Sequence, residues 1–326
     1  MPDTGQISRR ALLAAIPVVL ALPALAQDGY PARAVTLVVT FAAGGGVDVT
    51  SRIVGEAMGA ILGQRVVIDN RGGGATIPGT HGVVKAEPDG YTLLVAPTTM
   101  VLNPAFRTGL PFDWRTDLEP IALMAKLPFV VVARPDFPAS DMKALENLAR
   151  QRAQPLLFAS GGTGTVAHLA GEMFALRTGI KMQHVAYRGE GPSLTDLAGG
   201  TLDVTFATLA GASGQVQSGG LKALGVTSAE RANLLPSTPT IAEQGYPDFD
   251  VSAWMVLMAP KRTPSAVVER LRTVMVECLG RPDVREKLER IGAIPALGNQ
   301  DAERFLAREA DLWARVIKDS AIKIEQ

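Results

Sequence analysis

Residues 39–48 read Val39-Thr40-Phe41-Ala42-Ala43-Gly44-Gly45-Gly46-Val47-Asp48, and this stretch decides the fold. An apolar run typical of a β-strand, residues 35–39, ends at three consecutive glycines. An apolar pattern of helical period follows over residues 48–61. Glycine lets the backbone bend sharply and lets another molecule approach the main chain. The sequence therefore predicts a strand that enters a helix through a glycine turn.

Such a turn is a candidate anion site. The first N–H groups of a helix lack intrahelical partners and lie at the positive end of the helix dipole, so they favour a carboxylate or a phosphate. Asp48 has two possible roles here: an acid that stabilises the start of the helix, which we favour, or a ligand contact. The residues expected to form this first loop are Phe41, Ala42, Ala43, Gly44, Gly45, Gly46 and Asp48.

A second strand–glycine–helix unit occurs further along the chain. The apolar run 156–159 enters Ser160-Gly161-Gly162-Thr163-Gly164-Thr165, and a helical pattern covers residues 166–178. Its hydroxyl groups suit a helix cap and donors to a bound oxygen. His168 is either a ligand contact or a structural histidine with its hydrogen bonds made inside the protein. The ligand candidates in this second loop are Ser160, Gly162, Thr163, Thr165 and His168.

Apolar runs alternate with helical patterns along the chain, which predicts an α/β fold with a mainly parallel sheet covered on both faces. Ligands of open α/β sheets lie beyond the carboxyl ends of the strands, where both glycine loops would be. Two domains whose loops face each other across a cleft would explain both units. Thr98 and Thr99 follow the run 92–96, and Tyr187 follows the run 182–186, so these residues are further candidates. Asp203 is either a ligand contact or a turn aspartate.

Composition excludes several classes of function. The formal net charge is zero, so no basic excess indicates nucleic acid. Cys278 is the single cysteine and suits an apolar core position, while three histidines without metal-ligand spacing give no metal signal. We expect no cofactor.

The first residues resemble an export signal. Ser8-Arg9-Arg10 is basic, residues 11–22 are apolar, and Ala24-Leu25-Ala26 fits a cleavage site. The run is too short to span a bilayer comfortably. We expect a signal peptide over residues 1–26, cleaved near Ala26, that uses the Tat route or the Sec route.

Two enzymatic interpretations compete with a binding protein. Gly162-x-Gly164-x-x-Ala167 fits a loose dinucleotide fingerprint, but no acid follows at the expected place after the next strand. Ser160, His168 and Asp203 are in an order that a catalytic triad allows, but Ser160 lacks the Gly-x-Ser-x-Gly turn. We therefore favour a binding protein and keep a secreted serine hydrolase as the less favoured alternative.

Several segments together resemble one family, the extracytoplasmic solute receptors of the tripartite tricarboxylate transporter class, or Bug-type receptors. The matching segments span residues 30–31, 35–48, 62–64, 67–74, 88–94, 159–164, 168–172, 196–200, 234–245 and 254–260. The chain departs from the family at Thr40, Ala42 and Ala43, where proline is frequent, and at Ala186 and Arg188, where proline and lysine are common.

The resemblance implies a periplasmic binding protein of type II-like architecture that is not an enzyme. It would hold a dicarboxylate, an amino acid or a related organic acid in a cleft through main-chain groups of both loops. Domain one would comprise residues 27–127 plus 254–326, and domain two residues 128–253. We expect a monomer whose partner is the membrane part of a tripartite transporter or, alternatively, a sensor kinase. The ligand itself is not predicted.

Overall fold

The computed structural model describes residues 29–298 and 301–320. The chain forms two units, Met1–Tyr30 and Pro31–Gln326, and the helices and strands of the described residues lie in the second. The expected signal peptide, residues 1–26, lies outside the described residues. The elements up to the long central strand are β1 (Val35–Val39), α1 (Gly46–Leu62), β2 (Val66–Asn70), η1 (Gly74–Thr76), α2 (Ile77–Val84), β3 (Thr92–Pro97), α3 (Thr99–Phe106), α4 (Trp114–Asp117) and β4 (Leu118–Ala133).

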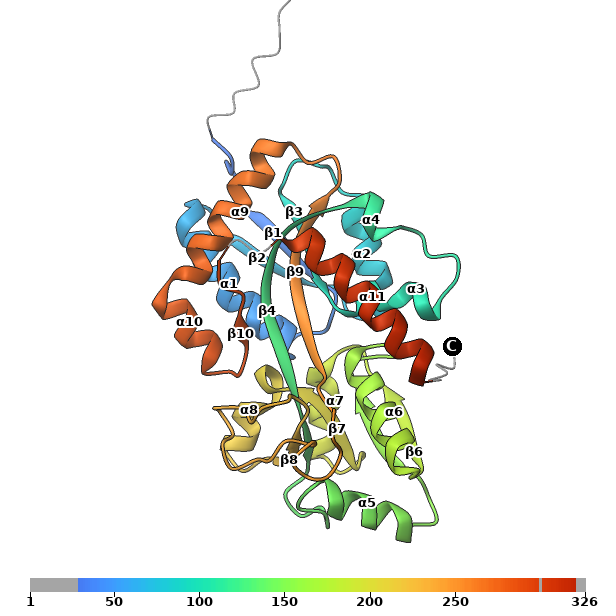
Figure 1. Ribbon diagram of the computed structural model, residues 1–326. Helices are drawn as coiled ribbons and strands as arrows, with labels where there is room; N and C mark the ends of the chain where they lie inside the picture. The colour runs from blue at the N-terminus through green and yellow to red at the C-terminus, as the bar shows by residue number, and fades with distance from the viewer. Residues whose placement is uncertain (1–28, 299–300, 321–326) are drawn as a thin grey trace, which may run out of the picture. The chain divides into compact units, whose positions relative to one another are not determined.

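The chain then passes through a second group of strands and helices before it returns to the first. The elements are α5 (Met142–Gln151), β5 (Leu156–Ser160), α6 (Val166–Thr178), β6 (Met182–Ala186), α7 (Glu190–Ala198), β7 (Val204–Thr208), α8 (Leu209–Gln217) and β8 (Lys222–Val226). The return consists of β9 (Ser252–Pro260), α9 (Ser265–Gly280), α10 (Pro282–Glu289), β10 (Ile294–Pro295) and α11 (Ala302–Ser320). Figure 1 shows α5–α8 around the second group of strands.

The sheet is mixed rather than mainly parallel. Its main path runs β2-β1-β3-β9-β4-β7-β5-β6, and β8 and β10 pair with β4. The predicted parallel pairing holds among β1, β2 and β3 and among β5, β6 and β7. In the part of the chain that the structure describes, the strand pairs that involve β4 or β9 are antiparallel. The first group of strands is thus β1, β2 and β3, and the second group is β5, β6 and β7. The chain crosses between the two groups on β4 and β9, which pair antiparallel with their neighbours.

Strand β4 differs most from what the sequence predicts. The sequence predicts two separate strands in this part of the chain, from the apolar runs 121–124 and 129–133. They form one strand, which pairs with β9 over its first part and with β7 and β8 over its last. Figure 1 shows β4 and β9 running side by side between the two groups. The expected domain boundaries, 127/128 and 253/254, fall within these two strands, and the division into domains stays a prediction.

Apolar side chains cover both faces of the second group. Phe129 and Val131 of β4 belong to one buried cluster, and Val130 and Val132 belong to another, as the alternation of side chains along a strand requires. Helices α5 and α6 complete the first cluster, and α7 and α8 complete the second. Cys278 of α9 is buried, as expected, and burial raises the pKa of its thiol to about 12.

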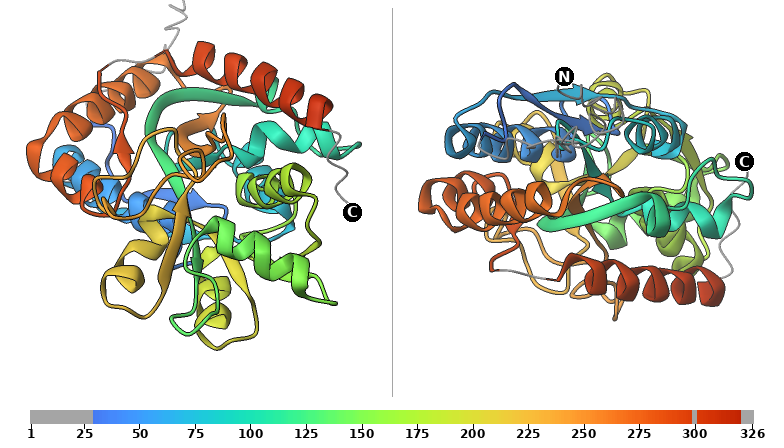
Figure 2. Two further views of the ribbon diagram at one scale, coloured as in Figure 1. Left: turned by 60° about the horizontal axis from the view of Figure 1, so that its bottom comes forward. Right: turned by 90° about the horizontal axis from the view of Figure 1, so that it is seen from above.

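Helix α3 was not predicted. Two threonines and an internal Pro104 lower the helix propensity of this segment. Burial overrides propensity here, because Met100, Leu102 and Asn103 are buried and the Asn103 amide donates to the Ala75 carbonyl at 2.9 Å. Figure 2 shows α11 lying beside α3 and the long strand β4, in agreement with the contacts that α11 makes with both. Within the described residues, no helix combines the length and the apolar character that crossing a membrane requires.

Candidate functional site

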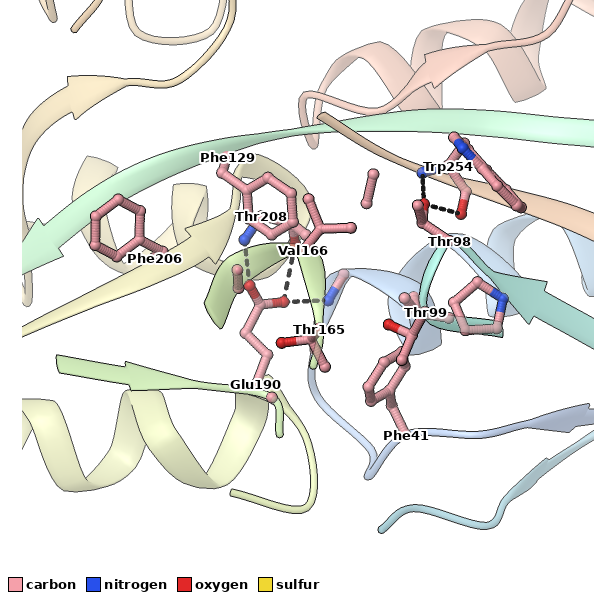
Figure 3. A pocket seen from close by; sticks show the side chains of 17 residues that line it. Phe41, Thr98, Thr99, Phe129, Thr165, Val166, Glu190, Phe206, Thr208 and Trp254 are labelled. Atoms are coloured by element: carbon pink, nitrogen blue, oxygen red, sulfur yellow. Dashed lines mark hydrogen bonds between the residues drawn. The ribbon is translucent and has the colours of Figure 1, made fainter. Parts of the chain in front are cut away.

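A cavity of about 60 Å³ lies where the carboxyl ends of β1, β3, β5 and β7 meet. This is the place expected for a ligand in an α/β fold. Figure 3 shows the aromatic and hydroxyl side chains that surround it. The cavity is lined by Phe41, Gly45, Gly46, Val47, Pro97, Thr98, Thr99, Phe129, Gly161, Thr165, Val166, Ala167, Glu190, Phe206, Thr208, Ala253 and Trp254.

The first loop brings the start of α1 against the second group of strands. A Cβ atom on Gly46 would lie 2.0 Å from the Thr208 hydroxyl, so only glycine fits there. The Ala42 N–H donates to the Arg188 carbonyl at 3.1 Å, and a Cβ atom on Gly189 would lie 2.7 Å from the Ala42 nitrogen. The β6–α7 loop therefore rests directly on the first loop.

Asp48 fastens the first loop from inside and does not line the cavity. Its carboxylate accepts the Gly44 N–H at 3.0 Å, pairs with Arg52 at 2.8 Å and accepts the Asn70 amide at 3.0 Å. Burial acts to raise the pKa of Asp48, but the hydrogen bonds from Arg52, Gly44 and Asn70 and the charge of Arg52 lower it overall. These contacts agree with the favoured role of an acid at the helix start, and a direct ligand contact of Asp48 stays a prediction.

The second loop is closed by hydrogen bonds of its own. Thr165 caps α6, because its hydroxyl accepts the His168 N–H at 3.3 Å and donates to the Gly162 carbonyl at 2.8 Å. Gly164 N–H donates to His168 Nδ1 at 3.1 Å. The N–H groups of Val166 and Ala167 are the first two of the helix and have no intrahelical partner, and both residues line the cavity. The start of α6 is therefore the part of this loop that can meet an anion.

The triad is not assembled. Ser160 is buried and its hydroxyl contacts His184 Nε2 at 2.7 Å, not His168. His168 stacks on His184, with ring centroids 3.7 Å apart. Asp203 lies at the other end of its strand, where it pairs with Arg152 at 2.8 Å and accepts the Leu157 N–H at 2.8 Å. Its carboxylate orders the start of β5 and β7, which favours the structural one of its two possible roles. Asp203 does not meet Ser160 or His168, as a triad would require.

His184 predicts a dependence of stability on pH. Burial, and then the nearby His168, lowers the pKa of His184 from 6.5 to about 3. Between these values the unfolded chain binds the proton and the folded chain does not, so the free energy of unfolding falls as pH falls from about 6.5 towards 3. One such group contributes up to about 1.4 kcal/mol per pH unit.

Urea denaturation at pH 7, 6, 5 and 4 measures this dependence. We expect the wild-type chain to lose more stability on acidification than His184→Gln, since glutamine does not titrate. Equal slopes for the two proteins would contradict a neutral, buried His184.

The remaining predicted residues fall into three sets: those that line the first cavity, those that line a second cavity, and those that line neither. Phe41, Gly45, Gly46, Thr98, Thr99 and Thr165 line the cavity. Phe41 also borders a second cavity of about 290 Å³, together with Gly162, Thr163, Tyr187, Arg107 and Arg188. The Tyr187 hydroxyl donates to Asp196 at 2.6 Å, and burial first, then this bond, raises its pKa to about 12. Ala42, Ala43, Gly44, Ser160 and His168 line neither cavity, and instead shape the loops.

Arg107 links α3 to the second loop beside this second cavity. Its guanidinium donates to the Thr163 carbonyl at 3.3 Å and to the Asn103 side chain at 3.2 Å. Burial lowers the pKa of Arg107. Arg188 is exposed at the same cavity, so an anion that approaches from this side meets two cationic side chains.

Sequence reasoning missed Glu190, the central polar residue of the site. One carboxylate oxygen accepts the Gly46 N–H at 2.8 Å and the Thr208 hydroxyl at 2.9 Å, and the other accepts the Thr208 N–H. Burial raises the pKa of Glu190, although these hydrogen bonds oppose the rise. The signal available was an acid at the first position of a helix after a glycine. Nothing local indicated that its side chain would reach α1.

Solved structures define the class of protein. The periplasmic binding protein BugD superposes with a TM-score of 0.86 at 32% identity, over 91% of this chain and all of that one. The R. palustris protein Rpa4515 with adipate gives 0.86 at 33% identity, over 90% and 99%. MatC from Rhodopseudomonas palustris with bound malate gives 0.83 at 30% identity, over 88% and 100%. The fold is that of the periplasmic solute-binding proteins, as expected.

The family follows from the sequence comparisons. Residues 50–322 match the model described as "Tripartite tricarboxylate transporter family receptor". A protein encoded in the tcbD-tcbE intergenic region of Pseudomonas sp. strain P51 is 37% identical over 100% of this chain and 98% of its own length. BugT of Bordetella pertussis is 33% identical over 96% and 98%. The chain belongs to the tripartite tricarboxylate transporter receptor family, which confirms the resemblance. Its solved members include a periplasmic binding protein, and two of them hold the carboxylates adipate and malate.

Proposed function

We propose that this chain is an exported receptor that captures a small carboxylate in the first cavity, between the two groups of strands. The observation that carries the proposal is the meeting of two glycine-loop helix starts, those of α1 and α6, at one cavity. The solved relatives with adipate and with malate support a carboxylate ligand.

The start of α6 supplies the polar contacts of the proposed complex. The N–H groups of Val166 and Ala167 would receive one carboxylate oxygen each, and the Thr99 hydroxyl lines the same cavity. Thr98 has a different role, because its hydroxyl accepts the Trp254 N–H at 2.8 Å and so joins β3 to β9. Thr165 is engaged in capping α6.

Apolar contacts supply the rest of the affinity. A helix start contributes about 0.3–2 kcal/mol to an anion, whereas micromolar binding corresponds to about −8 kcal/mol. Each buried CH₂ group of a ligand adds about 0.8 kcal/mol. Phe41, Phe129, Phe206 and Trp254 offer the apolar surface for this burial.

The two groups of strands act as two domains in this proposal, residues 27–127 plus 254–326 and residues 128–253. They are joined only through β4 and β9 in the sheet, and bending of these strands would open the cavity. The cavity is smaller than the roughly 150 Å³ that holds benzene in an engineered protein, so a ligand enters an open form and shifts the equilibrium towards a closed one.

The partner is the membrane part of a tripartite transporter, to which the closed form delivers its ligand. The signal peptide at residues 1–26 would bring the chain to the periplasm, where it would act as a monomer. A receptor for a sensor kinase would bind the same ligand and differ only in its partner. Co-purification with the transporter membrane subunits after ligand loading distinguishes the two.

A thermal-shift titration tests the proposal. We expect one or more small carboxylates to raise the unfolding temperature of residues 27–326 in a concentration-dependent way, as linkage requires. Asp203→Asn is the control, because Asp203 lies away from the cavity: it is expected to lower the starting temperature and to leave the affinity unchanged. A panel of mono-, di- and tricarboxylates, amino acids and aromatic acids without any shift contradicts the proposal, provided that mass spectrometry finds no ligand retained from expression.

A further inference from the structure

Glu190 joins the two groups of strands at the cavity. It is the first residue of α7 in the second group. Thr208, which donates to it through both N–H and hydroxyl, ends β7 of the same group. Gly46, which donates its N–H at 2.8 Å, is the first residue of α1 in the first group. Figure 3 shows the Glu190 carboxylate in the midst of these donors.

Three of the N–H donors in and before the start of α1 are therefore already used from within the chain. Asp48 accepts the Gly44 N–H, Glu190 accepts the Gly46 N–H, and the Ala42 N–H donates to a carbonyl. The space is used as well, because a Cβ atom on Gly45 would lie 3.0 Å from the Cβ atom of Glu190, and one on Gly211 would lie 2.4 Å from its carboxylate. The start of α1 thus already holds a carboxylate of the chain itself, so among the two glycine-loop helix starts that of α6 is the better place for a ligand carboxylate.

A ligand would not easily displace the Glu190 side chain from the start of α1. Two of its three hydrogen bonds come from Thr208 of its own group, so opening between the groups breaks only the bond from Gly46. The glutamate would thus stay in place while a ligand enters. A ligand carboxylate near α1 would then meet a second carboxylate in a site from which water is largely excluded, where like charges repel strongly.

The rest of the lining offers no compensation for a second negative charge. Among the described residues that line the cavity, none is basic, and most are apolar or aromatic. The two arginines nearby, Arg107 and Arg188, line the second cavity instead. A ligand with one carboxylate at α6 and an apolar remainder matches this lining.

We propose that Glu190 is a specificity-determining residue: it occupies the anion site of α1 itself, and the receptor therefore selects small monocarboxylates over dicarboxylates of the same length. The inference rests on the proposed function and deepens it.

Isothermal titration with butyrate and succinate tests the inference. Both probes have four carbons, so they match in length and differ in the second carboxylate. We expect wild type to bind butyrate at least tenfold more tightly than succinate. Glu190→Ala removes the charge and the side chain, and we expect it to reduce this ratio at least tenfold by gaining succinate binding. Glu190→Gln keeps the shape, and we expect a smaller change in the same direction.

Glu277→Ala is the matched control, because it removes the same charge from an exposed position on α9 and should leave the ratio unchanged. An unchanged ratio in both Glu190 variants, with circular dichroism of a folded protein, overturns the inference while carboxylate binding still supports the proposed function. Equal gains for both probes also overturn it, since Glu190 would then be a competitor and not a selector. Failure of every variant to bind any carboxylate of the wider panel overturns the proposed function itself.

Discussion

Gly46→Val is expected to weaken carboxylate binding strongly while the protein stays folded. Its Cβ atom would lie 2.0 Å from the Thr208 hydroxyl and 3.0 Å from the Ala210 Cβ atom, closer than side chains tolerate. The two groups of strands would have to separate at the start of α1, and the bond from Gly46 to Glu190 would lengthen or break. Overpacking of this kind costs about 1–3 kcal/mol, so we expect affinity to fall about 5- to 150-fold.

Titration calorimetry with the ligand found in the thermal-shift screen measures this effect, and small-angle scattering reports whether the groups still approach each other. Gly214→Ala is the control, because Gly214 lies on α8 with no atom near the position of an added Cβ. It should bind as wild type does. Wild-type affinity in Gly46→Val would mean that the start of α1 has no part in closure.

The glycine loops could be predicted from the sequence because their signals are local. A β-type run, consecutive glycines and a helical period occur within about one strand and one helix of each other, and the structure has β1, α1, β5 and α6 where these patterns lie. The mixed sheet could not be predicted in this way. The pairing of β4 with β9 joins residues more than 100 positions apart, and the two apolar runs within β4 predicted two separate strands.

Polar residues of the site were harder to predict, since their roles depend on which end of a strand they occupy. Asp203 begins β7 and so lies at the amino end of the sheet, whereas Thr208 ends the same strand and reaches the cavity. The rule that ligands meet the carboxyl ends of strands could have told these two positions apart. It could not have identified Glu190, because its partner Gly46 is distant in sequence and belongs to the other group of strands.

Phe158→Ala is expected to cause the largest loss of stability among single substitutions near the site. Phe158 of β5 is fully buried, and its ring lies 5.0 Å from that of His184 and 6.1 Å from those of His168 and Phe206, measured between centroids. It also packs so closely on α6 that a Cβ atom on Gly171 would lie 2.2 Å from the ring. Removal of a buried phenylalanine costs about 3–5 kcal/mol, which urea denaturation at pH 7 measures.

Leu176→Ala supplies the comparison for this loss, because Leu176 lies on α6 with 55% of its surface exposed and should change stability by less than about 0.5 kcal/mol. The cavity left by Phe158→Ala would also admit water to His184, whose pKa is held near 3 chiefly by burial. We therefore expect the pKa of His184, followed by NMR, to rise in Phe158→Ala. A loss below 1 kcal/mol would mean that α6 collapses into the space, and the second loop would then be adjustable rather than fixed by its core.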